Sequence, residues 1–152
     1  MSRSGFGTEP RVPLSHPLSV LALAWIVSTA IPDSAAQSGK ACLPPEMKQA
    51  QREVSHIVDW EGLHHSFKRF GQCDSGHLEE EYSYTLGRLL AHNWNHVDAL
   101  LELTDTDPDF KRFILKHIDE NIPEEEAQII TRNARHNCPE RGDWLCKAIV
   151  DY

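Results

Sequence analysis

Four cysteines constrain the fold of this chain more than any other feature of its sequence. They stand at Cys42, Cys73, Cys138 and Cys146. An even number of cysteines in a small exported chain indicates a disulfide framework, and four cysteines allow three pairings. A structural zinc site would need close pairs such as Cys-x-x-Cys, and the sequence has none. We therefore expect two disulfides, and we favour the nearest-neighbour pairing, Cys42 with Cys73 and Cys138 with Cys146.

The first disulfide would restrict the helices between its two cysteines. Two apolar sets follow each other there: Met47, Ala50, Val54, Ile57 and Val58, then Trp60, Leu63, Phe67 and Phe70. At 100° per residue the two sets point roughly 150° apart, so one straight helix would expose one of them. Such a helix would also hold the sulfurs about 40 Å apart, whereas a disulfide needs Cα atoms within about 7 Å. The sequence therefore predicts a break near 59–62 between two helices, about 45–58 and 60–71.

The N-terminal region is typical of an export signal. Residues 17–31 form an apolar stretch, two arginines precede it, and the small residues Ser34-Ala35-Ala36 follow it. These are the marks of a secretory signal peptide. The apolar stretch would span about 22 Å as a helix, short of the roughly 30 Å hydrocarbon core of a membrane. We expect a signal peptide at 1–36, a short exposed lead at 37–43, and one domain at 44–152 with no membrane span, exported to the periplasm or outside the cell.

The rest of the sequence carries helix signals and lacks the alternating pattern of strands. Apolar residues in steps of three and four predict one long central helix at about 77–103. Asp107-Pro108 and Pro123 are typical helix starts, and a last short helix is expected at 144–151. The sequence therefore predicts an all-α, disulfide-stapled bundle of five to six helices.

The charge of the chain restricts its partners. The formal net charge is −8 at pH 7 with neutral histidine, and the charges of the first 36 residues cancel. Nucleic acids and anionic membrane surfaces need a positive footprint, so we expect neither as a partner. We expect another protein as the partner, and a basic one if the overall charge steers the encounter.

Histidines offer a candidate metal site. His92 and His96 are four residues apart on the expected long helix, so their rings could hold zinc or another divalent metal together. The tract lacks the glutamate of zinc hydrolases, and two surface histidines are the alternative. Two Glu-x-x-His elements, at 53–56 and 61–64, match the ligand pattern of di-iron bundles, with solvated charges as the alternative.

No catalytic motif is found, so we expect no enzyme and no obligate cofactor. The sequence has no nucleophile elbow and no phosphate-binding glycine loop. Trp94 lies beside the apolar ladder and is the residue expected to contact a partner, since aromatic residues are common interface anchors. The function favoured is a non-enzymatic protein-binding module of the inhibitor or immunity-protein type. The alternatives are a His-mediated metal-binding protein and a carrier of a small apolar ligand, whose pocket would be lined by Phe67, Phe70, Phe110 and Phe113.

Overall fold

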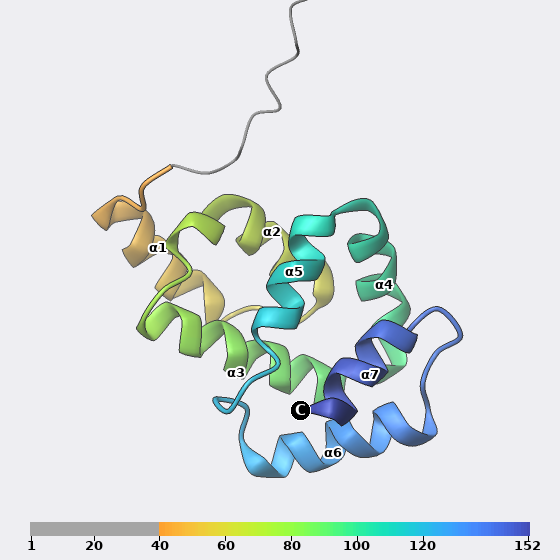
Figure 1. The fold of residues 1–152 in the computed structure, drawn as a ribbon. Coiled ribbons are helices and arrows are strands. Elements are labelled where there is room, and N and C mark those ends of the chain that lie inside the picture. Colours follow the sequence, from red (N-terminus) through yellow and green to blue (C-terminus); the bar gives the residue numbers. More distant parts are fainter. Residues whose placement is uncertain (1–39) are drawn as a thin grey trace, which may run out of the picture. The chain divides into compact units, whose positions relative to one another are not determined.

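All regular structure in the described part of the chain is helical. The computed structural model describes residues 40–152, so the expected signal peptide at 1–36 lies outside the described residues. The elements are α1 (Pro44–Val54), α2 (Trp60–Phe70), the 3-10 turn η1 (Gly71–Cys73), α3 (His77–His92), the 3-10 turn η2 (Trp94–His96), α4 (Val97–Thr106), α5 (Pro108–Lys116), α6 (Glu124–His136) and α7 (Asp143–Asp151) (Figure 1). The expected all-α, disulfide-stapled class is confirmed. None of the helices in this part is both long and apolar enough to cross a bilayer.

The chain folds back between α1 and α2, as the two apolar sets predict. The Asp59 side chain caps α2 by accepting a hydrogen bond from a first-turn backbone N–H at 2.8 Å. The fold-back brings the Cα atoms of Cys42 and Cys73 to 4.8 Å, and the two sulfurs are bonded. A second disulfide joins Cys138 to Cys146, with Cα atoms 6.1 Å apart, and staples the loop after α6 to α7. The favoured pairing is confirmed.

The expected long helix at 77–103 is wrong, because the chain turns at Asn93 and continues as a separate helix. Asn93 leaves the helical conformation with φ −119° and ψ 22°, and η2 separates α3 from α4. The Asn93 side chain donates to the Val58 carbonyl oxygen at 3.1 Å. Short polar side chains that bond outside the helix compete with its backbone ladder. This break raises the number of α-helices to seven within residues 40–152.

Helix α3 carries the centre of the core. Its inward face is fully buried and consists of Leu78, Tyr82, Leu86 and Leu90. It packs against α1 and α6, while α2 packs against α1 and α4. Figure 1 shows α6 on the opposite side of α3 from α2 and α5. The gap between α2 and α5 is the part of the fold that places the candidate site.

Candidate binding groove and the histidine beside it

Aromatic rings fill the space between α2 and α5. The Phe67 ring centroid lies 5.4 Å from that of Phe110 and 4.9 Å from that of Phe113. Phe110 is fully buried, and Phe70 exposes 3% of its surface under the Arg69 guanidinium. The four phenylalanines therefore pack into the core rather than surrounding a space for an apolar ligand. The cluster reaches the surface at Phe67 and at the edge of Phe113.

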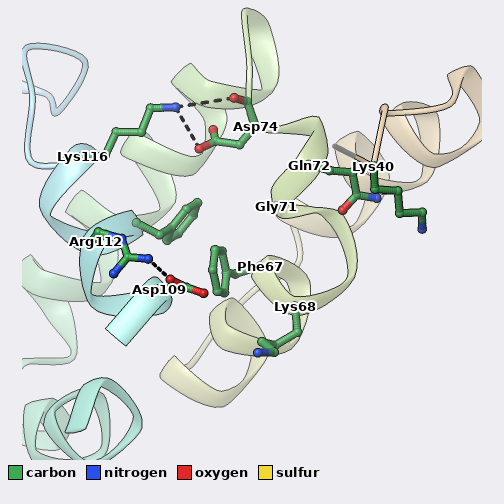
Figure 2. A pocket seen from close by; sticks show the side chains of 10 residues that line it. Lys40, Phe67, Lys68, Gly71, Gln72, Asp74, Asp109, Arg112 and Lys116 are labelled. Carbon is green, nitrogen blue, oxygen red and sulfur yellow. Dashed lines mark hydrogen bonds and ion pairs between the residues drawn. The ribbon is translucent and has the colours of Figure 1, made fainter. Parts of the chain in front are cut away.

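A groove of about 460 Å³ opens at this edge of the aromatic cluster. The cationic side chains that line it are Lys40, Lys68, Arg112 and Lys116, and the carboxylates are Asp74 and Asp109. Figure 2 shows Arg112 and Lys116 projecting from α5 on one side, with Phe67, Lys68 and Lys40 on the other. Four cations and two carboxylates thus line the groove, on a chain whose net charge is −8, and each of the four cations also has a carboxylate within 4 Å.

The cations of the rim are exposed, and each is paired with a carboxylate. Arg112 exposes 72% of its side chain and pairs with Asp109 one helical turn away. Lys68 exposes 51% of its side chain and lies 3.0 Å from Asp107. Ion pairs between exposed side chains contribute only about 0–1 kcal/mol. A carboxylate from another molecule can therefore compete for Arg112, whose partner Asp109 is also exposed, at little cost.

A buried hydrogen-bonded network adjoins the groove. His117 follows α5 directly and is fully buried. Its Nε2 atom lies 3.1 Å from Asp74 Oδ2, and its Nδ1 atom lies 2.8 Å from the Ser83 hydroxyl oxygen. The same Ser83 oxygen lies 2.8 Å from Asp119 Oδ2. The network thus joins the turn after η1 and helix α3 to the residues that follow α5, His117 and Asp119.

Asp74 belongs to both the groove and the network. Its Oδ2 atom accepts hydrogen bonds from Lys116 Nζ at 2.9 Å as well as from His117. Burial raises the pKa of Asp74, but the hydrogen bonds and positive charges of His117 and Lys116 outweigh burial and hold that pKa below its usual value. Asp74 is therefore an anion that clasps α5, one wall of the groove, to the turn on the opposite wall.

Ser83, His117 and Asp74 are the residue types of a hydrolytic triad, but their arrangement does not expose a nucleophile. Ser83 and His117 both have no solvent-exposed surface. A substrate carbonyl cannot approach the Ser83 hydroxyl through the packed side chains around it. What the three residues do in this position is hold α3, α5 and the Asp74 turn together.

The structure places the two candidate metal ligands on different elements. His92 is the last residue of α3, and His96 is the last residue of η2, so the helical spacing that would align their rings is absent. The Nε2 atom of His92 lies 3.9 Å from Glu126 Oε1. Within residues 40–152 no group of three or more His, Cys, Asp or Glu side chains has an arrangement that could hold a metal ion.

Trp94 is half-buried and serves as an internal anchor. Its ring packs against the core, and its Nε1 atom donates to the Asn137 carbonyl oxygen at 3.0 Å. It therefore fastens the α3–α4 turn to the end of α6. The groove between α2 and α5 does not include it.

Sequence reasoning did not find the groove, because its cations come from three separate segments with no linear motif. One signal for the network was present, since His117 stands in the apolar stripe of α5 with Phe110, Phe113 and Ile114. A histidine at a core position needs polar partners, and these lie far away in sequence. Comparison of the chain with protein-family models, curated proteins and solved structures gives no match. The functional argument therefore rests on the geometry of the site.

Proposed function

We propose that this protein is an exported, non-enzymatic binding module that captures an acidic segment of another protein in the groove between α2 and α5. The observation that carries the proposal is the set of exposed cations around an aromatic floor, on a chain that is otherwise acidic. Carboxylates of the partner pair with the rim, and an apolar side chain between them packs on Phe67 and the edge of Phe113. Such a combination of an aromatic anchor and complementary charge is what protein interfaces use for affinity and register.

The proposed partner segment is acidic, whereas the overall net charge of the chain favours a basic partner. Net charge acts at long range, whereas docking depends on the groups in contact. The side chains that line the groove include four cations and two carboxylates, so the captured segment is acidic there. Disulfides form and persist in oxidising compartments, which supports export to the periplasm or outside the cell.

An NMR titration of residues 37–152 with three short peptides tests the proposed function. The probes are acetyl-EELEE-amide, its lysine counterpart acetyl-KKLKK-amide, and acetyl-EEGEE-amide, which lacks the apolar side chain. We expect the first peptide to shift the amide signals of Phe67, Gly71 and Arg112, and the third to bind more weakly. Equal or stronger binding of the lysine peptide at these residues would overturn the proposal.

A matched pair of charge variants makes the test specific to the groove. Arg112→Gln removes a rim cation, and Arg132→Gln removes an exposed arginine on α6, outside the groove. We expect Arg112→Gln to weaken binding of acetyl-EELEE-amide about threefold to tenfold, the range of one solvent-exposed charge contact. Arg132→Gln should leave the affinity unchanged. Equal losses in the two variants would mean that the peptide responds to overall charge and not to the groove.

A further inference from the structure

The hydrogen bonds around His117 indicate how many protons its ring carries. Three short contacts need a hydrogen: Nε2 to Asp74, Nδ1 to Ser83, and Ser83 to Asp119. The Ser83 hydroxyl supplies one hydrogen, and the Glu79 carbonyl oxygen at 3.2 Å competes for it. A neutral imidazole supplies one more and leaves one contact without a hydrogen. A doubly protonated ring supplies two, and all three contacts are then satisfied.

The surroundings of the ring also favour its charged form. The titratable groups that face it from the neighbouring elements are Asp74 in the turn after η1, Glu79 and Tyr82 in α3, Lys116 in α5 and Asp119 after α5, with Glu120 and Tyr152 around Asp119. Asp119 keeps its acceptor role, since its Oδ1 atom accepts from the Asn121 backbone N–H at 2.9 Å. Burial raises the pKa of Tyr82 to about 12, so this phenol stays neutral. Two carboxylates thus flank the ring, and Lys116 is the one cation in this set.

We propose that His117 is a buried imidazolium that clasps the groove closed at its Asp74 end, and that losing its proton weakens capture of an acidic segment. The inference rests on the proposed function for its effect on binding, and on the proton count for the charge of the ring. His117 is a positioning residue, because it touches Asp74 and does not touch the captured segment.

The charge balance gives the direction of the effect. With His117 charged, the two cations His117 and Lys116 balance the two carboxylates Asp74 and Glu79. With His117 neutral, Lys116 is left as the only cation between Asp74 and Glu79. The local charge then falls by one unit. The clasp is therefore complete while the ring carries both protons and is weakened when the ring loses one.

The charge of the ring can be read directly by long-range ¹H–¹⁵N NMR of residues 37–152 between pH 5 and 9.5. We expect both ring nitrogens of His117 to be protonated at pH 7. The amide signals of Asp74 and Lys116 should move at the pH where the ring loses a proton, with no peptide present. A His117 ring with one unprotonated nitrogen at pH 7 would overturn the inference.

Binding of acetyl-EELEE-amide across the same pH range tests the link to the groove. We expect its affinity to fall about fivefold through the step that the His117 ring shows, as one unit charge nearby is lost. If the peptide binds but its affinity ignores that step, the clasp does not regulate the groove. If it does not bind at any pH, the proposed function fails, and the ring spectrum still decides the charge of His117.

Two variants separate His117 from other histidines and from simple loss of structure. Asp119→Asn removes one flanking negative charge at a partly exposed position, so the step seen in the His117 ring should move to lower pH, and the binding step with it. His64→Gln is the control, because His64 is a second histidine near the groove and lies 3.0 Å from Asp107 beside Lys68. The step in binding should survive in His64→Gln. A step that vanishes there, or stays in place in Asp119→Asn, would contradict the assignment to His117.

Discussion

Asp107 connects α2 to the start of α5 through both of its carboxylate oxygens. Its Oδ1 atom accepts hydrogen bonds from the backbone N–H groups of Asp109 and Phe110, each at 3.1 Å, and so caps α5. Its Oδ2 atom lies 3.0 Å from His64 Nε2 and 3.0 Å from Lys68 Nζ. Burial raises the pKa of Asp107, but the hydrogen bonds from His64 and Lys68 outweigh burial and lower the pKa to about 2.

The lowered pKa of Asp107 predicts a loss of stability in acid. A carboxylate with a depressed pKa in the folded state stabilises the protein above its unfolded pKa, and this contribution disappears as the pH falls through the folded value. The window here runs from about pH 4 to about pH 2. Urea unfolding should show the unchanged chain losing about 1–2 kcal/mol more than Asp107→Asn across that window. Parallel curves for the two proteins would contradict this assignment.

For Asp107, the sequence predicts the helix cap but not the ion pairs. The cap was predictable, because an Asp before a Pro at the first helical position is a local signal. The ion pairs were not, since His64 and Lys68 are 43 and 39 residues away along the chain. They meet Asp107 through the packing of α2 beside the start of α5, and periodicity does not give that geometry. The same limit applies to His117, whose partners lie 34 to 43 residues away.

At the scale of elements, Gly87 of α3 lies close to the segment before α6. A Cβ atom on Gly87 would lie 2.9 Å from Ile122 Cγ2, closer than such atoms pack. Gly87→Ala should therefore lower the free energy of unfolding by about 1 kcal/mol, although alanine is the better helix former. Urea unfolding measures this change.

A second variant provides the control for Gly87. Ile122→Ala removes the side chain in the way, so adding Gly87→Ala to it should stabilise the chain by up to about 1 kcal/mol, the difference in helix propensity. The sign of the Gly87 effect should thus reverse between the two backgrounds. Stabilisation in both backgrounds would mean that the segment before α6 moves aside freely and the close approach carries no constraint.

The two disulfides differ in the length of chain they close. Cys42–Cys73 spans a separation of 31 residues and Cys138–Cys146 spans 8. Loop-closure entropy then gives stabilisations of about 3.7 and about 2.5 kcal/mol. Replacing the first pair by alanine should cost about 1 kcal/mol more in urea unfolding than replacing the second. Each pair has one buried member, so the cavity costs are similar. A larger cost for the second pair would place its contribution in the packing of α7.

The apolar pattern predicted two helices for α1 and α2, although α1 ends at Val54 and the break precedes residue 60, and it missed the end of α3 for a definite reason. Leu90 and Val97 are seven residues apart, which is two helical turns, so the ladder stays in phase across the break. The break depends on tertiary bonds, from Asn93 to the Val58 carbonyl and from Trp94 to the Asn137 carbonyl. The pairing of Cys42 with Cys73 was predictable because it requires only that the chain fold back.

At the scale of the whole molecule, charge has opposite signs at long and short range. The net charge of −8 belongs to residues 40–152, because the charged residues before them cancel. The cations of the groove come from the first described residue, from α2 and from α5, and they act over a few ångströms. An acidic segment approaching this molecule is therefore repelled at a distance and attracted on contact.

This separation predicts an unusual response of association to salt. The Debye length falls from about 30 Å at 10 mM to about 8 Å at 150 mM salt, which screens the long-range repulsion but spares close contacts in the groove. Stopped-flow measurements with fluorescently labelled acetyl-EELEE-amide should show an association rate constant that rises about twofold to fivefold over this range. The lysine counterpart should show a falling rate, as attraction to the acidic exterior is screened. An acidic peptide whose association slows with salt would mean that it meets a positive field at long range, which a chain of this net charge does not provide.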